Sequence, residues 1–100
     1  MFQMKIEGTR MKYRSVGVFS NETDEEMTIF LEVLCEEIHM SPGHEIELLA
    51  EDNDDHFPVT ILYHKEGLQV YPRSGCTEWK FIFNGREYTA DYPSKLSELN

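Results

Sequence analysis

The sequence predicts an α+β fold in which one amphipathic α-helix packs on a curved, mainly antiparallel β-sheet of about five to seven strands. Apolar residues recur at helical spacing between residues 23 and 40, and short alternating or β-branched runs, separated by turn residues, occupy the rest of the chain. A chain of 100 residues, of which 40% are hydrophobic, is long enough for a single domain over residues 1–100 with one core.

Two strands are expected before the helix. Residues 2–7 alternate between apolar and polar side chains, which is the period of a half-buried strand. Residues 11–19 are expected to form the second strand, with a bulge or bend near Gly17. A turn at residues 8–9 would join the two strands as a hairpin.

The helix is expected to begin at Thr23 and to end near Met40. Thr23 and Glu26 have the spacing of a capping box, in which each side chain bonds an exposed amide at the start of a helix. At about 100° per residue, the apolar positions fall on one face: they are Met27, Phe30, Leu31, Leu34 and Ile38. The Ser-Pro-Gly sequence at residues 41–43 would end the helix.

Five further strands are expected after the helix. Residues 45–50 alternate as a strand that leads into an acidic turn at residues 51–55, and residues 57–64 and 68–71 are expected to pair as a hairpin.

The strongest hairpin signal joins residues 77–83 to residues 86–92. Asn84 and Gly85 lie between these runs, and both residue types tolerate the positive φ angles of a type I′ turn. Residues 93–100 are expected to form a polar tail or terminal turn.

Negative charge is concentrated in the middle of the chain. Residues 15–64 contain thirteen Asp and Glu and no Lys or Arg, whereas residues 1–14 carry a net charge of +3 and residues 65–100 a net charge of zero. Protein surfaces normally mix both signs, so this segregation predicts one continuous negative surface. The net charge of −10 disfavours direct binding to nucleic acid.

On the expected helix, carboxylates form a row opposite the apolar stripe. Glu25, Glu32 and Glu36 lie within about 20° of one another on the helical wheel, at separations comparable with those of nucleic-acid phosphates. Ile29 and Val33 lie near this row and are expected to be partly exposed as anchors for a partner. The predicted partner-binding residues are Glu22, Glu25, Ile29, Glu32, Val33, Glu36, Glu37, Glu51, Asp52, Asp54 and Asp55.

The expected function is that of a non-enzymatic inhibitor or decoy that occupies a basic, nucleic-acid-binding cleft of a larger protein by mimicking nucleic acid. Small inhibitory proteins from viruses and bacterial toxin systems resemble this chain in size, acidity and expected architecture, so phage anti-defence or antitoxin is the corresponding type. The alternative is a structural or adaptor module that binds a protein partner through a sheet edge or an aromatic sheet face, with acidity serving only solubility. A homodimer through a sheet edge is also compatible with the pattern.

No enzyme activity, metal or cofactor is expected, because the chain has no phosphate-binding glycine loop, no G-x-S-x-G and no H-E-x-x-H. Asp52 and Asp54 alternate as in a calcium loop, but the Gly and Glu that such a loop needs further along are missing. Cys35 and His39 form at most one unmatched pair of zinc ligands. With Cys76 as its only other cysteine and no secretory signal pattern, the chain is expected to be cytoplasmic.

Overall fold

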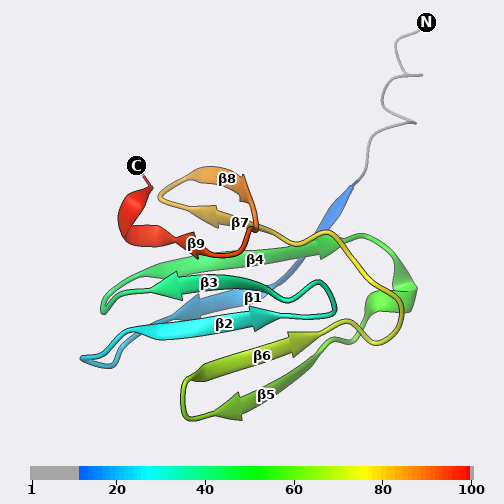
Figure 1. Cartoon of the computed structure of the whole chain (residues 1–100). Coiled ribbons are helices and arrows are strands. Elements are labelled where there is room, and N and C mark those ends of the chain that lie inside the picture. Colours follow the sequence, from blue (N-terminus) through cyan, green and yellow to red (C-terminus); the bar gives the residue numbers. More distant parts are fainter. Residues whose placement is uncertain (1–11, 100) are drawn as a thin grey trace, which may run out of the picture.

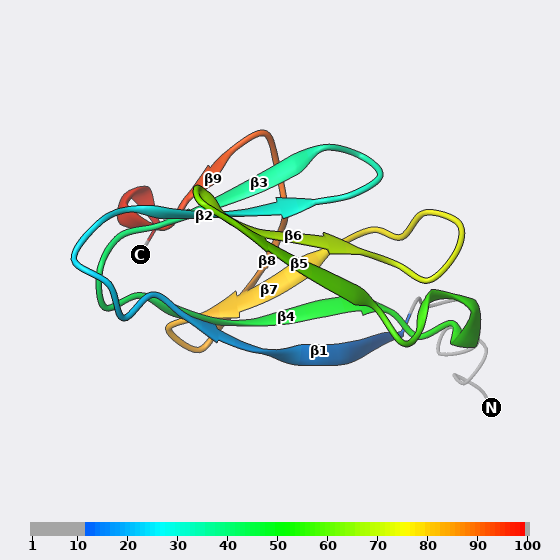
Figure 2. The ribbon, with the colours of Figure 1, turned by 90° about the horizontal axis from the view of Figure 1, so that it is seen from below.

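The computed structural model describes residues 12–99, which form two β-sheets lying face to face (Figure 1). Figure 2 shows the two layers from below, with β1 and β4 in one layer and β2, β3 and β6 in the other. The predicted α+β class is therefore wrong, because the described chain is a β-sandwich.

The first sheet is antiparallel throughout and has the strand order β1-β4-β7-β8. Its strands are β1 (Tyr13–Ser20), β4 (Glu45–Glu51), β7 (Lys80–Phe83) and β8 (Arg86–Thr89).

The second sheet has the order β5-β6-β2-β3-β9 and is mixed, since β6 runs parallel to β2 and β9 runs parallel to β3. Its strands are β2 (Met27–Leu31), β3 (Glu36–Met40), β5 (Thr60–His64), β6 (Gly67–Tyr71) and β9 (Ser94–Lys95). Two 3₁₀ segments, η1 (Asp54–His56) and η2 (Leu96–Glu98), are the helical elements of the described chain. Within residues 12–99, no helix is long and apolar enough to cross a membrane.

The predicted helix from Thr23 to Met40 is absent, and the antiparallel strands β2 and β3 take its place. Apolar residues in this segment also recur at every second position, on either side of a turn at residues 32–35. As strands, they bury Ile29, Leu31, Ile38 and Met40 completely against the opposite sheet. The same residues fit both the helical spacing and the alternating spacing of a strand, and burial between the two sheets favours the strand.

The predicted capping box at Thr23 is a loop motif instead. Asn21 is buried, and its Oδ1 accepts hydrogen bonds from the Thr23 amide at 3.0 Å and from Thr23 Oγ1 at 2.7 Å. Asn21 Nδ2 donates to the carbonyl oxygens of Glu25 and Met40, both at 2.8 Å. Short polar side chains bond nearby backbone in turns as readily as at helix starts, which explains the wrong prediction.

Several sequence predictions about strands are confirmed. The expected strand over residues 45–50 is β4, and both hairpins after it form, as β5–β6 and β7–β8. Asn84 and Gly85 have φ angles of 51° and 77°, as the predicted turn requires. The register of β1 against β4 shifts between Ser15 and Gly17, which is the predicted bulge.

The predictions for the two ends of the chain have different outcomes. The predicted first strand over residues 2–7 and its hairpin lie outside the described residues. At the other end, β9 pairs with β3, and Leu96 is buried in the core, within the segment expected to be a polar tail.

The core lies between the sheets and draws side chains from both. Its largest member, Trp79, is fully buried just before β7 and donates from Nε1 to the carbonyl oxygen of Glu32 at 2.8 Å. This bond ties the β2–β3 turn of one sheet to the strand entry of the other. The buried apolar residues are Phe19, Ile29, Leu31, Ile38, Met40, Ile46, Leu48, Ala50, Val70, Trp79, Phe81, Phe83, Ala90 and Leu96.

The β5–β6 hairpin joins the sandwich through a close backbone contact at Gly67. Gly67 has a φ angle of +147°, and a Cβ atom there would lie 1.8 Å from the carbonyl oxygen of Thr28. Only glycine allows β6 to approach β2 so closely at the start of their parallel pairing.

Replacing Gly67 by Ala should therefore destabilise the protein much more than replacing Gly17 by Ala. Gly17 is a matched control, because its φ angle is +144° and a Cβ atom there would meet nothing within 4 Å. Gly17→Ala should cost only the backbone strain of about 1–3 kcal/mol, and Gly67→Ala at least about 2 kcal/mol more. Urea denaturation of both variants measures the difference; equal losses would contradict the close contact.

Candidate protein-binding edge

The predicted partner-binding residues lie at two opposite ends of the sandwich. Glu22 and Glu25 belong to the β1–β2 loop, which meets the β3–β4 turn through a hydrogen bond from the Asn21 amide to the His44 carbonyl oxygen at 2.9 Å. Glu32 lies in the β2–β3 turn at the far end of β2. Glu51 ends β4 at that same far end, and residues 52–55 follow it (Figure 1). The row of helical carboxylates therefore does not exist.

Two carboxylates of the far end contact neighbouring side chains. Glu32 Oε2 accepts from Gln69 Nε2 at 2.8 Å, and Glu37 Oε1 lies 2.8 Å from His39 Nε2. Adjacent residues of a strand point to opposite faces, so Glu36 and Glu37 at the start of β3 do not form a common surface.

The acidic turn at residues 51–55 is partly neutralised from outside the acidic half of the sequence. Arg14 on β1 donates to Asp52 Oδ1 at 2.6 Å and to Asp54 Oδ1 at 2.8 Å. Its hydrogen bond and its positive charge lower the pKa of Asp54. Asp55 carries no such partner among the described residues, while the Glu51 carboxylate accepts from the Glu78 amide at 3.1 Å.

The two apolar anchors behave differently. Ile29 was expected to be partly exposed, but it points into the core from β2 and is 0% exposed. Val33 lies at the tip of the β2–β3 turn and is 54% exposed, as expected. The prediction for Ile29 is wrong because it assumed a helical period.

Glu36 is a buried carboxylate at the far end of the sandwich. It is 7% exposed, and its Oε1 has no hydrogen-bond partner among the described residues. Burial raises the pKa of Glu36, and the negative charges of Asp91 and Glu78 raise it further. A group in this position destabilises the fold when ionised and is unsuited to contact a partner.

Strand β5 is the most accessible apolar part of the described chain. Tyr63 is 85% exposed, Leu62 is 47% exposed and Ile61 is 45% exposed, although all three lie within the strand. Figure 1 shows β5 as the outermost strand of its sheet, beyond β6. Both faces of β5 are therefore open, and its outer edge has no strand partner among residues 12–99.

The other three sheet edges carry features that hinder the addition of a strand. Strand β1 is interrupted by its bulge, β9 has two residues, and β8 begins with the charged residues Arg86 and Glu87. Bulges, shortness and charge are the usual means by which edge strands avoid pairing with other chains. Strand β5, with the sequence TILYH, has none of these features and contains no Lys, Arg, Asp or Glu.

Two of the exposed side chains of β5 lie on the core side of the sheet. Ile61 pairs with Val70, and Tyr63 pairs with Leu68, so these residues share a face. In β6, Val70 in turn pairs with the buried Leu31 of β2. The apolar inner face of the second sheet thus continues onto β5, where the first sheet no longer covers it.

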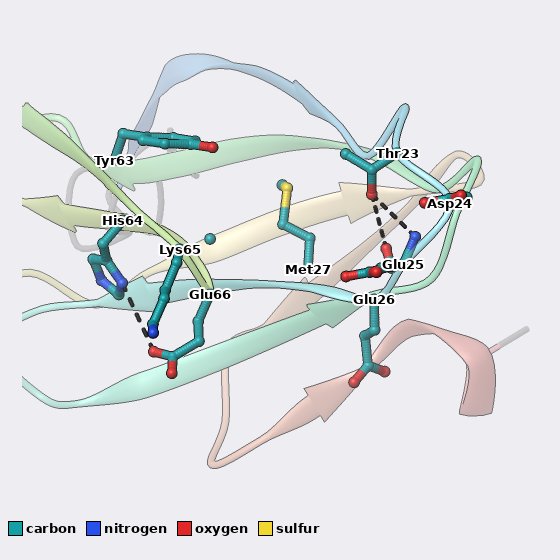
Figure 3. A pocket seen from close by; sticks show the side chains of 10 residues that line it. Thr23, Asp24, Glu25, Glu26, Met27, Tyr63, His64, Lys65 and Glu66 are labelled. Atoms are coloured by element: carbon teal, nitrogen blue, oxygen red, sulfur yellow. Dashed lines mark hydrogen bonds and ion pairs between the residues drawn. The ribbon is translucent and has the colours of Figure 1, made fainter.

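A hollow of about 200 Å³ adjoins the end of β5 (Figure 3). One wall is residues 23–27, from the β1–β2 loop and the start of β2, and the other is residues 63–67, where β5 turns into β6. Figure 3 shows Met27 between the two walls and the ring of Tyr63 extending over the hollow towards Thr23. The hollow therefore combines an apolar centre with a polar rim.

The chemistry of the remaining candidate groups is limited. Within residues 12–99, no three His, Cys, Asp or Glu side chains are arranged to hold a metal ion. Cys35 and Cys76 are both exposed free thiols. His56 is buried, with Nδ1 at 3.1 Å from the Ser74 carbonyl oxygen and Nε2 at 3.5 Å from Glu51 Oε1, so its contacts connect η1 to the β6–β7 loop and to the end of β4.

The sequence predicts the β5–β6 hairpin but not the exposure of its outer strand. The signal was an uncharged, β-branched and aromatic run within a chain whose charged residues make up 28% of the total. Its significance depends on β5 being an edge strand, which is a property of the topology.

Comparison with known protein families, curated proteins and solved structures found no match to this chain.

Replacing Glu36 by Gln should raise stability at pH 7 and leave it unchanged below pH 4.5, the ordinary pKa of the group. A carboxyl with a raised pKa holds its proton more tightly in the folded state, so its ionisation costs stability only above that pH. The expected gain at pH 7 is about 1 kcal/mol, or roughly 4–8 °C in Tm. Thermal denaturation from pH 4 to 8 measures it.

The exposed Glu22 provides the control, since Glu22→Gln removes the same charge without relieving burial. An equal gain in both variants would assign the effect to net charge and would contradict the role given to burial of Glu36.

Proposed function

We propose that this protein is a non-enzymatic binding module that takes up an extended segment of a partner protein as an added strand along β5. The observation that supports this function best is that β5 is an edge strand without charged residues and with both faces exposed. This is the alternative that the sequence allowed, an adaptor that binds through a sheet edge.

When a strand is added to a sheet edge, backbone hydrogen bonds supply affinity and side-chain contacts supply specificity. The outward amides and carbonyls of β5 would form the ladder with the partner strand, and such hydrogen bonds contribute about 0.5–1.5 kcal/mol each. Ile61 and Tyr63 on one face and Leu62 on the other offer apolar area that becomes buried in the complex. Aromatic side chains such as Tyr are common among the residues that dominate binding energy.

The net charge argues for a different protein as the partner rather than a second copy. Pairing two copies through β5 would bring together two molecules that each carry a charge of −10. A neutral or basic segment avoids this repulsion, and a basic one is also attracted over long range.

The decoy hypothesis stays a prediction, but its geometric basis has been lost. Its carboxylates are divided between the two ends of the sandwich, and Arg14 binds two of them. The two hypotheses differ in salt dependence, because strand addition to an uncharged edge should persist at about 0.5 M salt, whereas capture through exposed charges is screened.

Tyr63→Lys should weaken partner binding at least tenfold, because it places a charge on the inner face of the edge. Peptides selected from a random displayed library on the wild-type protein serve as ligands, and fluorescence anisotropy measures their affinity. Thr89→Lys is the matched control, since it adds the same charge on the exposed edge strand β8 and should change affinity less than twofold.

Hydrogen exchange locates the bound peptide. Strand addition predicts that amides of β5 exchange more slowly in the complex, with little change in β8. Peptides that slow exchange elsewhere, or that bind Tyr63→Lys as well as the wild type, would contradict the proposal, as would a library from which no peptide is enriched.

A further inference from the structure

We infer that the segment bound by β5 carries a Lys or Arg side chain that enters the hollow between the β1–β2 loop and the β5–β6 turn. This inference rests on the proposed function, and it names the chemistry by which that edge would choose its partner.

The position of the hollow relates it directly to the edge. Tyr63 is both a residue of β5 and part of the lining of the hollow, and its side chain lies on the core side of the sheet. Side chains of an added strand alternate between the two faces, so every second one projects on the same side as Ile61 and Tyr63. A residue placed opposite the end of β5 on that side therefore lies beside the hollow.

The size of the hollow suits one long side chain. Its volume of about 200 Å³ is several times the space of about 30 Å³ that one water molecule occupies, so it has room for a group much larger than water. Met27 lies at its centre, and the Tyr63 ring extends over it (Figure 3). Methylene groups of a Lys or Arg side chain can lie against these apolar atoms while the cationic end reaches the polar rim.

The negative charge of the rim favours a positively charged side chain in the hollow. Four acidic residues are among those that line the hollow, Asp24, Glu25, Glu26 and Glu66, against one lysine, Lys65. Figure 3 shows Asp24 and Glu25 on one side and Glu66 on the other, with Glu26 directed away.

Two of these carboxylates are available to a cationic guest. Among the described residues, no ion pair joins Asp24 or Glu25 to a cation, whereas Glu66 Oε1 lies 3.9 Å from His64 Nδ1. The hydrogen bonds of Thr23 and Asn21 hold the backbone of this loop at Thr23 and Glu25. The loop is thus fixed in place while the side chains of Asp24 and Glu25 remain unpaired, so a cation gains their attraction without breaking an existing pair.

Matched peptides test the inference on the full chain. The probes are fluorescent eight-residue peptides of alternating Val and Thr in which one position, moved along the peptide, is Lys, norleucine or Glu. At the position that meets the hollow, the Lys peptide should bind at least tenfold more tightly than the norleucine peptide, and the Glu peptide should bind more weakly than both. This preference should fall as salt rises from about 0.05 to 0.5 M, because the rim is exposed to solvent.

Neutralising the rim should remove the preference without removing binding. In the Asp24→Asn, Glu25→Gln double variant, the Lys and norleucine peptides should bind within about twofold of each other. Asp55→Asn, Glu98→Gln is the control, because it removes two exposed charges that do not line the hollow and should keep the preference for Lys.

The outcomes separate this inference from the proposed function. If the peptides bind and slow exchange in β5 but Lys gives no advantage at any position, the inference is overturned and the edge proposal stands. If no peptide binds, or if β5 amides already exchange slowly in the free protein because another part of the chain or a second copy covers them, both are overturned. A preference for Lys that survives in the Asp24→Asn, Glu25→Gln variant also overturns the inference.

Discussion

The close backbone approach of β6 to β2 determines where the exposed edge strand β5 lies. Gly67 permits this approach, and through it the β5–β6 hairpin becomes part of the second sheet. Within residues 12–99, the second sheet then has five strands against four in the first, and the strand left uncovered is β5. A steric constraint at one glycine thus creates an apolar strand edge that faces solvent on both sides.

The elements that the sequence could predict are those encoded by local turn chemistry. The Asn84-Gly85 turn and the turn after His64 each fix a hairpin with few residues, independently of the rest of the chain. The segment from Met27 to Met40 could not be assigned in this way, because its apolar residues satisfy both a helical and an alternating period. Burial between two sheets decided it, and the partner sheet is formed by residues distant in sequence.

The candidate site was less predictable than the fold. Counting charges along the sequence placed the acidic residues in one half, but a sandwich folds that half back and forth, so its loops lie at opposite ends. Arg14, far from Asp52 in sequence, neutralises part of one end. Which strand lies at an edge follows from the order β5-β6-β2-β3-β9, whose parallel pairings no local pattern encodes.

The pairing of β9 with β3 affects how the protein emerges during synthesis. Residues 94–96 add the last strand to the second sheet and bury Leu96 against the core, and the ribosome adds them after the other strands of residues 12–99. Until they leave the exit tunnel, the side of β3 that pairs with β9 has no neighbour, and unpaired strand edges of this kind make partly folded chains prone to aggregation. Premature termination shortly before residue 94 would thus release a sandwich with an open side, a substrate suited to proteolytic quality control.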